Sequence, residues 1–283
     1  MEGNVVGVCK PVGATPLEAL REYVAASGGP ESTRRSYAGR LDPMAEGLLV
    51  VLEGARCEEQ AAWQHHGKEY AWELLLGLSS DSYDVLGLGR LQLPADWDAA
   101  VREATRALEQ TLLGRRQQPY PPFSSARVAG HPLFWWAQQG RLAEVEIPRV
   151  EVEVRACRVG CVRWAPVALL MREMLERVSL VRGTGFRQEA VCTRWREVLG
   201  ALPSGTRLPL LSVRCAVSSG TYVRALAHEA AAAAGCGGLA WSICRTAVLG
   251  TPLSLLAAFP VQPVSARLFR AVMALLQRRG FID

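Results

Sequence analysis

The sequence predicts an α+β fold in which helices flank a mixed, largely antiparallel sheet. Two patterns lead to this prediction. Short apolar or alternating segments between glycine and proline residues are typical of strands, and other segments repeat apolar residues at helical spacing. The chain has 283 residues, of which 49% are hydrophobic and 21% charged. This length and composition allow a large core, so we expect one large domain, with or without a substantial insertion.

In the N-terminal half, the sequence predicts three strands and two helices. Residues 5–11, VVGVCKP, predict a short buried strand, and residues 16–26 behind them have helical spacing. Residues 47–54, GLLVVLEG, and residues 70–77, YAWELLLG, are short and lie between turn signals, which favours strands. Residues 96–113 repeat apolar side chains at i, i+3 and i+4 and predict an amphipathic helix. The apolar side of this helix would contain Leu108, Leu112 and Leu113.

The C-terminal half predicts two further strands separated by an insertion. Residues 117–140 are rich in proline, aromatic and basic side chains and predict a loop that ends in a short helix. Alternation predicts strands at residues 149–155 and 210–217. The arginine-rich stretch between them, about residues 160–209, mixes helical and loop signals and predicts an insertion between two strands of one sheet. The alanine-rich residues 225–234 end at GCGG, which is typical of a helix with a glycine stop.

The charge balance favours a polyanionic partner. The formal net charge of +5 suits a local basic groove for nucleic acid. Nearly all basic residues are arginine, and Lys10 and Lys68 are the only lysines. Guanidinium groups bind phosphate well, and codon bias is the simpler explanation.

The cysteines indicate a reducing compartment. The eight cysteines are scattered, and only Cys157 and Cys161 lie close together, without the paired CxxC clusters of zinc sites. We therefore expect free thiols, no metal and an intracellular location, in the cytoplasm or an organelle matrix such as the mitochondrial one. The N-terminus lacks a targeting pattern, and no apolar stretch reaches the roughly twenty residues that span a bilayer, so we expect no membrane partner.

Three separated segments place polar side chains beside turns. Asp42 lies in GRLDPMAEGLL, Tyr70 near the start of a predicted strand, and Tyr222 and Arg224 in SSGTYVRALA. Spacing by two would put Tyr222 and Arg224 on the same side of an extended segment. Convergence in a cleft would give a carboxylate kept ionised by a guanidinium, above an aromatic floor for a flat ligand. The alternative is structural, because aspartate before proline often forms turns and both tyrosines could be core residues.

These segments resemble motifs of the TruB family of RNA pseudouridine synthases. GRLDPMAEGLL is similar to the family's catalytic loop, VCKPVGATP to its Lys-Pro motif and SSGTYVRALAHE to its Gly-Thr-Tyr-Val/Ile-Arg segment. KEYAWELLLGLSSDSYDVLG resembles the tyrosine-containing strand and acidic turn, and WSICRTAVLG a late segment with Ile243 at an aliphatic position. The sequence departs from the family at Tyr37 and Ala38, near the place of a histidine, and at Cys9, in place of an aspartate.

The resemblance implies the family's fold, with a central RNA-binding cleft. Residues 1–250 would form the catalytic domain, including the insertion at about residues 160–209. Residues 251–283 would be a short tail without a complete PUA domain. Asp81 and Asp84 of the acidic turn are expected to cap the loop rather than to bind a ligand.

The resemblance also implies the activity, which is isomerisation of a flipped-out uridine to pseudouridine in structured RNA, either tRNA or rRNA, without a cofactor. Asp42 would attack or deprotonate the ribose, Tyr70 would stack on the base and take the C5 proton, and Arg224 would pair with Asp42. Tyr222 and Ile243 would line the pocket. Lys10 and Arg40 are further expected substrate-binding residues.

A basic and aromatic stretch is the expected RNA surface. Interleaved arginine and aromatic side chains suit phosphate contacts and stacking on folded RNA, although they could also be a solvated face beside a core cluster. We favour the RNA surface. Its residues are Arg115, Arg116, Tyr120, Phe123, Arg127, Trp135 and Trp136.

The alternative function is an RNA-binding ribosome assembly factor that is catalytically dispensable or inactive. The arginine-rich insertion would suit docking on a ribosomal assembly particle. The presence of Asp42, Tyr70 and Arg224 together argues against this alternative. In either case the expected partner is RNA and not DNA.

Overall fold

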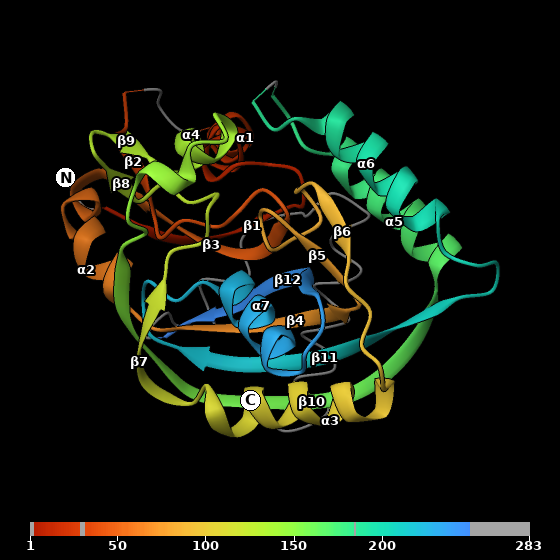
Figure 1. The fold of residues 1–283 in the computed structure, drawn as a ribbon. Helices are drawn as coiled ribbons and strands as arrows, with labels where there is room; N and C mark the ends of the chain where they lie inside the picture. Colours follow the sequence, from red (N-terminus) through yellow and green to blue (C-terminus); the bar gives the residue numbers. More distant parts are fainter. Residues whose placement is uncertain (1–2, 29–31, 184, 250–283) are drawn as a thin grey trace. The chain divides into compact units, whose positions relative to one another are not determined.

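The computed structural model describes residues 3–28, 32–183 and 185–249 (Figure 1). These residues divide into two compact units. The first comprises the described residues of Met1–Tyr70 and Cys244–Asp283 together with Leu180–Arg182, and the second comprises Ala71–Ser179 and Gly183–Ile243. The predicted short tail, residues 251–283, lies outside the described residues, so the predicted domain boundary stays a prediction.

Strands and helices are interspersed along the chain without regular alternation, and together they confirm the predicted α+β class. The strands are β1 (Val5–Lys10), β2 (Arg35–Ala38), β3 (Ala45–Glu53), β4 (Lys68–Leu76), β5 (Leu78–Ser80), β6 (Gly89–Leu91), β7 (Gly114–Pro119), β8 (Arg127–Val128), β9 (His131–Pro132), β10 (Arg149–Pro166), β11 (Arg207–Val217) and β12 (Gly238–Val248). The α-helices are α1 (Pro16–Ser27), α2 (Gln60–His65), α3 (Trp97–Arg106), α4 (Leu133–Gln138), α5 (Val167–Ser179), α6 (Gln188–Gly200) and α7 (Val223–Ala233). Short helical turns of other types are η1 (Gly54–Glu59), η2 (Ala107–Thr111) and η3 (Leu142–Glu144).

The first unit is built around β3. Its strand order is β1-β3-β12, and β2 also pairs with β3; β1 and β2 both run antiparallel to it. Helix α1 packs against β1, and its start follows from its sequence: Thr15 and Glu18 form a capping box, and Pro16 occupies the first turn. The predicted strands at 5–11 and 47–54 and the predicted helix at 16–26 are therefore confirmed.

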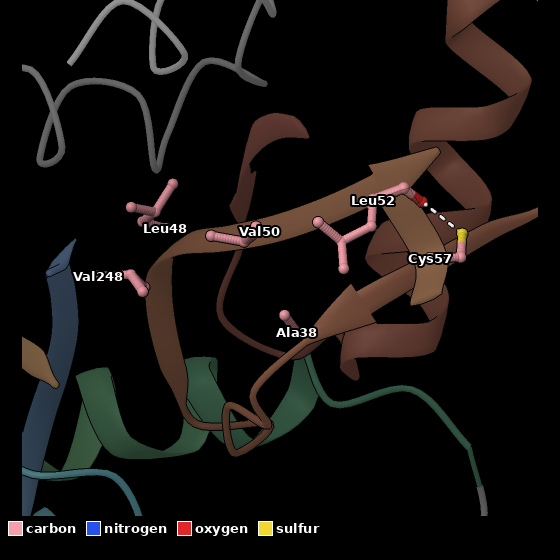
Figure 2. Packing of buried hydrophobic residues seen from close by; sticks show 6 residues of the cluster. All are labelled: Ala38, Leu48, Val50, Leu52, Cys57 and Val248. Atoms are coloured by element: carbon pink, nitrogen blue, oxygen red, sulfur yellow. Dashed lines mark hydrogen bonds between the residues drawn. The ribbon is translucent and has the colours of Figure 1, made fainter. Parts of the chain in front are cut away.

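A hydrophobic cluster holds this unit together (Figure 2). Alternate residues of β3 point to one side of the strand and meet apolar side chains from β2, η1 and β12. The cluster consists of Ala38, Leu48, Val50, Leu52, Cys57 and Val248. The Cys57 thiol also donates a hydrogen bond to the carbonyl of Leu52, at 3.2 Å, which ties η1 to the end of β3.

The second unit contains the strand order β12-β4-β11-β10-β7, and β10 runs antiparallel to both β11 and β7. Helix α7 packs its alanine-rich face closely, since a Cβ atom added to Gly238 would lie 2.2 Å from the Cβ of Ala231 and 3.1 Å from Leu74 of β4. The predicted strands at 70–77, 149–155 and 210–217 and the predicted helix at 225–234 are confirmed. Strand β10 continues to Pro166, well beyond its predicted end.

Three sequence predictions in this unit are wrong in part. Tyr222 and Arg224 do not share an extended segment, because α7 begins at Val223 and leaves Tyr222 as its N-cap. Leu108 and Leu112 are buried as predicted, but Leu113 is exposed, because it follows the end of the helical segment. The predicted loop at 117–140 ends in α4 as expected, but its first residues belong to β7, which pairs with β10.

The chain between β10 and β11 forms a pair of helices, α5 and α6, which pack against each other (Figure 1). Trp195 of α6 is fully buried, and its indole N–H donates to the carbonyl of Val85 at 2.9 Å. Gly89 makes room for this ring, since an added Cβ would lie 2.3 Å from it. None of the described helices is long and apolar enough to cross a membrane.

We predict that Gly89→Ala destabilises the protein. Its methyl group must displace the Trp195 ring, and overpacking of this kind typically costs about 1–3 kcal/mol. Chemical denaturation measures the change in the free energy of unfolding. Gly200→Ala is the matched control, because it adds a methyl group to α6, the helix that carries Trp195, where an added Cβ meets no heavy atom within 4 Å beyond its own part of the helix. Equal stability of the two variants would contradict the prediction.

Candidate active site

Asp42 lies in the turn between β2 and β3. The carbonyl of Asp42 accepts a hydrogen bond from the backbone N–H of Ala45 at 3.0 Å, and the carbonyl of Pro43 accepts one from Gly13 at 2.8 Å. Gly39 opens the turn with a φ of +79°, a conformation that other residues rarely adopt. The Asp42 side chain is partly exposed. The sequence therefore forms a fixed turn that presents a carboxylate.

Lys10 supports this turn from β1. It is completely buried, and its ammonium donates to the carbonyls of Pro11, Ala14 and Pro43, at 2.8, 2.7 and 3.5 Å. Burial lowers its pKa to about 7, and the negative charge of Asp42 opposes this shift. Sequence reasoning expected Lys10 to bind substrate, and this stays a prediction; the hydrogen bonds of its ammonium go to backbone carbonyls of residues 11–14 and of Pro43.

Arg245 supports the same turn from β12, and sequence reasoning missed it. Its exposed fraction is 1%, its Nε donates to the Leu48 carbonyl at 2.6 Å, and its Nη1 donates to the Arg40 carbonyl at 3.0 Å. Its Nη2 is buried with no hydrogen-bond acceptor among the described residues. The Arg40 side chain itself is exposed. The sequence feature that could have identified Arg245 is an arginine inside the apolar strand WSICRTAV.

Both lysines of the chain are buried and bound to carbonyls. Lys68, at the start of β4, donates to the carbonyls of Gln64 and His66 at 2.6 and 2.5 Å. Burial, and to a smaller extent the nearby positive charge of Arg245, lower its pKa to about 8. A compact ammonium can donate to several carbonyls from a single nitrogen atom, because it carries three N–H groups. Tyr70, two residues further along β4, is buried as well.

Arg224 lies in the first turn of α7 with an exposed fraction of 2%. Its Nη1 donates to the Ser82 carbonyl at 2.6 Å and its Nη2 to the Phe123 carbonyl at 3.3 Å, and its Nε lies 3.7 Å from the carboxylate of Asp84. A buried guanidinium is thus held in one orientation by acceptors from two separate loops. The expected pairing of Arg224 with Asp42 stays a prediction.

The acidic turn has the capping role expected of it. Oδ1 of Asp84 accepts from the Ser82 hydroxyl at 2.5 Å and from the Leu86 N–H at 3.0 Å, and Oδ1 of Asp81 accepts from the Leu88 N–H at 2.8 Å. Sequence reasoning missed the additional ion pair of Asp84 with Arg224.

Tyr222 and Ile243 both lie in the second unit. Tyr222 is partly exposed, and its ring meets that of Tyr120 edge to face, with the centroids 5.7 Å apart. The fully buried Gln118 of β7 fixes the Tyr222 backbone, accepting from its N–H at 2.8 Å and donating to its carbonyl at 3.2 Å. Ile243 is buried in β12. Gln118 is a second residue that sequence reasoning missed.

The predicted RNA surface contains both exposed and internal groups. Arg115 and Arg127 are exposed, whereas Arg116 pairs with Glu229 of α7 and is mostly covered. Trp136 is buried, and Trp135 is partly exposed with its ring stacked on His131 at 4.1 Å. The exposed arginines and Trp135 remain candidates for RNA contact.

Cys157 and Cys161 are free, and no metal-binding group of three or more His, Cys, Asp or Glu residues occurs within the described ranges.

The buried position of Lys10 makes stability depend on pH. Its pKa falls from 10.5 to about 7 on folding, so the unfolded chain binds more protons than the folded chain between these values. The free energy of unfolding must therefore rise as the pH increases through this window.

We predict that the stability of the wild type relative to Lys10→Met increases between pH 7 and pH 10, a window set by the pKa of about 7. Denaturation at several pH values measures the difference. Arg102→Met, at an exposed site, should differ from the wild type by the same amount at every pH. A pH-independent difference for Lys10→Met would show that its ammonium is not buried as described.

Comparisons with known proteins match the sequence to one family. Residues 31–177, just over half of the chain, match the model of the TruB family pseudouridylate synthase (N terminal domain). A protein named tRNA pseudouridine synthase B from Nitratidesulfovibrio vulgaris is 28% identical over 210 residues, which cover 74% of this chain and 53% of that protein. A protein of the same name from Bacteroides thetaiotaomicron is 30% identical over 168 residues, covering 56% and 68%.

Among solved structures, one described as a Cbf5-Nop10-Gar1 complex is similar at 17% identity with a TM-score of 0.49, over 86% of this chain and 48% of that chain. The chain spans about half the length of the first curated relatives that it matches. Asp42 and Tyr70 both lie within the residues matched by the family model. With more than half of its length matched, the chain belongs to the TruB family of pseudouridylate synthases.

Proposed function

We propose that this protein is an RNA pseudouridine synthase that isomerises a flipped-out uridine in structured RNA. The observation that carries the proposal is the Asp42 turn, in a chain of the TruB family. Two buried cations hold this turn: Arg245 donates to the carbonyl of Arg40, which precedes Asp42 in the sequence, and Lys10 to the carbonyl of Pro43, which follows it. Such preorganisation is what a carboxylate needs if it must meet one atom of a bound nucleotide.

The proposed reaction is an isomerisation within the enzyme. The bond between the ribose and N1 of uracil breaks, the base turns, and a bond forms to C5. C5 then loses its proton, and N1 gains one, so no oxidant or reductant is consumed. We assign Asp42 to attack or deprotonate the ribose and Tyr70 to stack on the base and remove the C5 proton. Arg224 is assigned to keep Asp42 ionised by charge pairing.

We propose tRNA as the first substrate to test, because the relatives named above are tRNA pseudouridine synthases. Arg40, Arg115 and Arg127 have exposed side chains that suit phosphate contacts, and Trp135 offers a ring face for stacking. Tyr222 and Ile243 are proposed to line the uridine pocket. A reducing compartment remains our expectation for its location.

We predict that Asp42→Asn abolishes pseudouridine formation while RNA affinity changes by less than about threefold, since asparagine keeps the shape and removes the nucleophilic charge. Conversion of a tRNA transcript and filter binding measure the two properties.

Tyr70→Phe is the matched control for this experiment. It keeps the stacking ring and should bind normally, and it should form product slowly if the hydroxyl takes the C5 proton. Wild-type protein that binds structured RNA but modifies neither tRNA nor rRNA would refute the synthase and favour an RNA-binding ribosome assembly factor.

A second prediction concerns the RNA surface. The double variant Arg115→Glu/Arg127→Glu should bind RNA more weakly, and each lost phosphate contact should reduce the log-log salt slope by about 0.7–0.9. The control is Arg102→Glu/Arg172→Glu, which makes the same change in net charge at exposed sites of α3 and α5. Equal slopes for the two double variants would place the RNA contacts elsewhere.

A further inference from the structure

The loop before α6 carries an arginine with an uncommon backbone conformation. Arg187 has a φ of +56° and a ψ of +30°, in the left-handed region that residues other than glycine seldom occupy. Its guanidinium donates two hydrogen bonds to the carboxylate of Asp81, from Nη1 to Oδ2 at 2.9 Å and from Nη2 to Oδ1 at 3.2 Å. Paired bonds of this kind fix the orientation of both partners.

The same guanidinium also lies over an aromatic ring. Its central carbon is 4.2 Å from the ring centroid of Phe123, which is well within the range of a cation–π interaction. A single side chain from the helical insertion therefore joins two loops of the second unit, the acidic turn at Asp81 and the loop at Phe123.

These two loops are the ones that hold Arg224. Its Nη1 donates to the carbonyl of Ser82, the residue next to Asp81, and its Nη2 donates to the carbonyl of Phe123 itself. A shift of either loop would move one of the two acceptors that orient the Arg224 guanidinium.

The insertion makes two more hydrogen bonds close to the acidic turn, one to Gly89 of β6 and one to Val85. Nε of Arg194 donates to the carbonyl of Gly89 at 2.9 Å, and the indole of Trp195 donates to the carbonyl of Val85 at 2.9 Å. On the other side of the Arg187 loop, Gln138 of α4 donates to the carbonyl of Gly185 at 2.9 Å. Helix α6 and its preceding loop are thus fastened to the elements that surround Arg224.

We propose that Arg187 is a positioning residue for the synthase reaction, which acts by holding the Ser82 and Phe123 carbonyls where they orient Arg224. This proposal rests on the proposed function, in which Arg224 takes part in catalysis. The insertion would then supply part of the support of the active site, and the unusual backbone conformation of Arg187 is the local cost of that placement.

The test compares kinetics of variants on the same tRNA transcript. Arg187→Ala should lower kcat by about 10- to 100-fold, as expected when a catalytic group is misplaced by about 1 Å, and should change KM by less than about threefold. Arg187→Lys should recover only part of kcat, because it restores the charge but not the paired bonds or the stacking. Asp81→Asn keeps the acceptor for Leu88 and loses the ion pair but not the stacking of Arg187 on Phe123, so it should also lower kcat, by no more than Arg187→Ala does.

The double variant Arg187→Ala/Asp81→Asn should be no slower than Arg187→Ala alone, because Asp81 acts through Arg187. Arg194→Ala is the matched control. It removes the hydrogen bond from α6 to the carbonyl of Gly89 in β6 and leaves the Arg187 contacts with Asp81 and Phe123 intact, so its kcat should equal that of the wild type. An unchanged kcat in Arg187→Ala, or an equal loss in Arg194→Ala, would overturn the proposal.

A second readout does not depend on activity. The side-chain NMR signal of the Arg224 guanidinium, assigned with Arg224→Lys, should shift and broaden in Arg187→Ala and remain unchanged in Arg194→Ala. An unaltered signal in Arg187→Ala would exclude positioning of Arg224, even in a protein that proved to lack synthase activity. Failure of the proposed function alone would instead appear as inactive wild type with the expected NMR difference.

Discussion

Buried cations need acceptors, and in this protein the backbone of loops supplies them. Among the described residues, the lysines and arginines that are buried as whole residues are Lys10, Lys68, Arg224 and Arg245. A cation removed from water is costly unless nearly all of its donors are satisfied. Each of these four side chains donates to main-chain carbonyls of a turn or loop. The result is that segments which would otherwise be held only at their ends are fixed in the middle.

This constraint explains the form of the Asp42 turn. Ionic groups in the interior seldom add stability over well-packed apolar side chains, so their value here lies in position. Lys10 from β1 and Arg245 from β12 bond carbonyls that precede and follow Asp42, and the hydrophobic cluster around β3 keeps these strands in register. The carboxylate itself stays partly exposed. A rigid frame with an accessible acid is the arrangement that the proposed chemistry requires.

In the second unit, loop carbonyls likewise hold a buried cation, Arg224, and the helical insertion in turn contacts these loops. The Ser82 and Phe123 carbonyls orient the guanidinium, and the helical insertion contacts both loops through Arg187. Burial of Trp195 against the acidic turn provides the apolar contact for this attachment, which Gly89 makes possible by lacking a side chain. The helices between β10 and β11 are therefore integrated into the fold.

The sequence by itself determined the main strands and helices, because apolar periodicity and turn residues act over a few positions. It also determined the Asp42 turn, where Gly39 permits a positive φ and Pro43 restricts φ, and the family motifs around it. Only the tertiary structure decided that α7 begins at Val223, since a short polar segment fits either a helix or a strand until it packs. It alone identified Arg245 and Arg187, whose acceptors lie 205 and 106 residues away along the chain. Local patterns predict which backbone conformation a segment adopts, whereas the acceptors of a buried cation come from whichever distant segments the fold brings beside it.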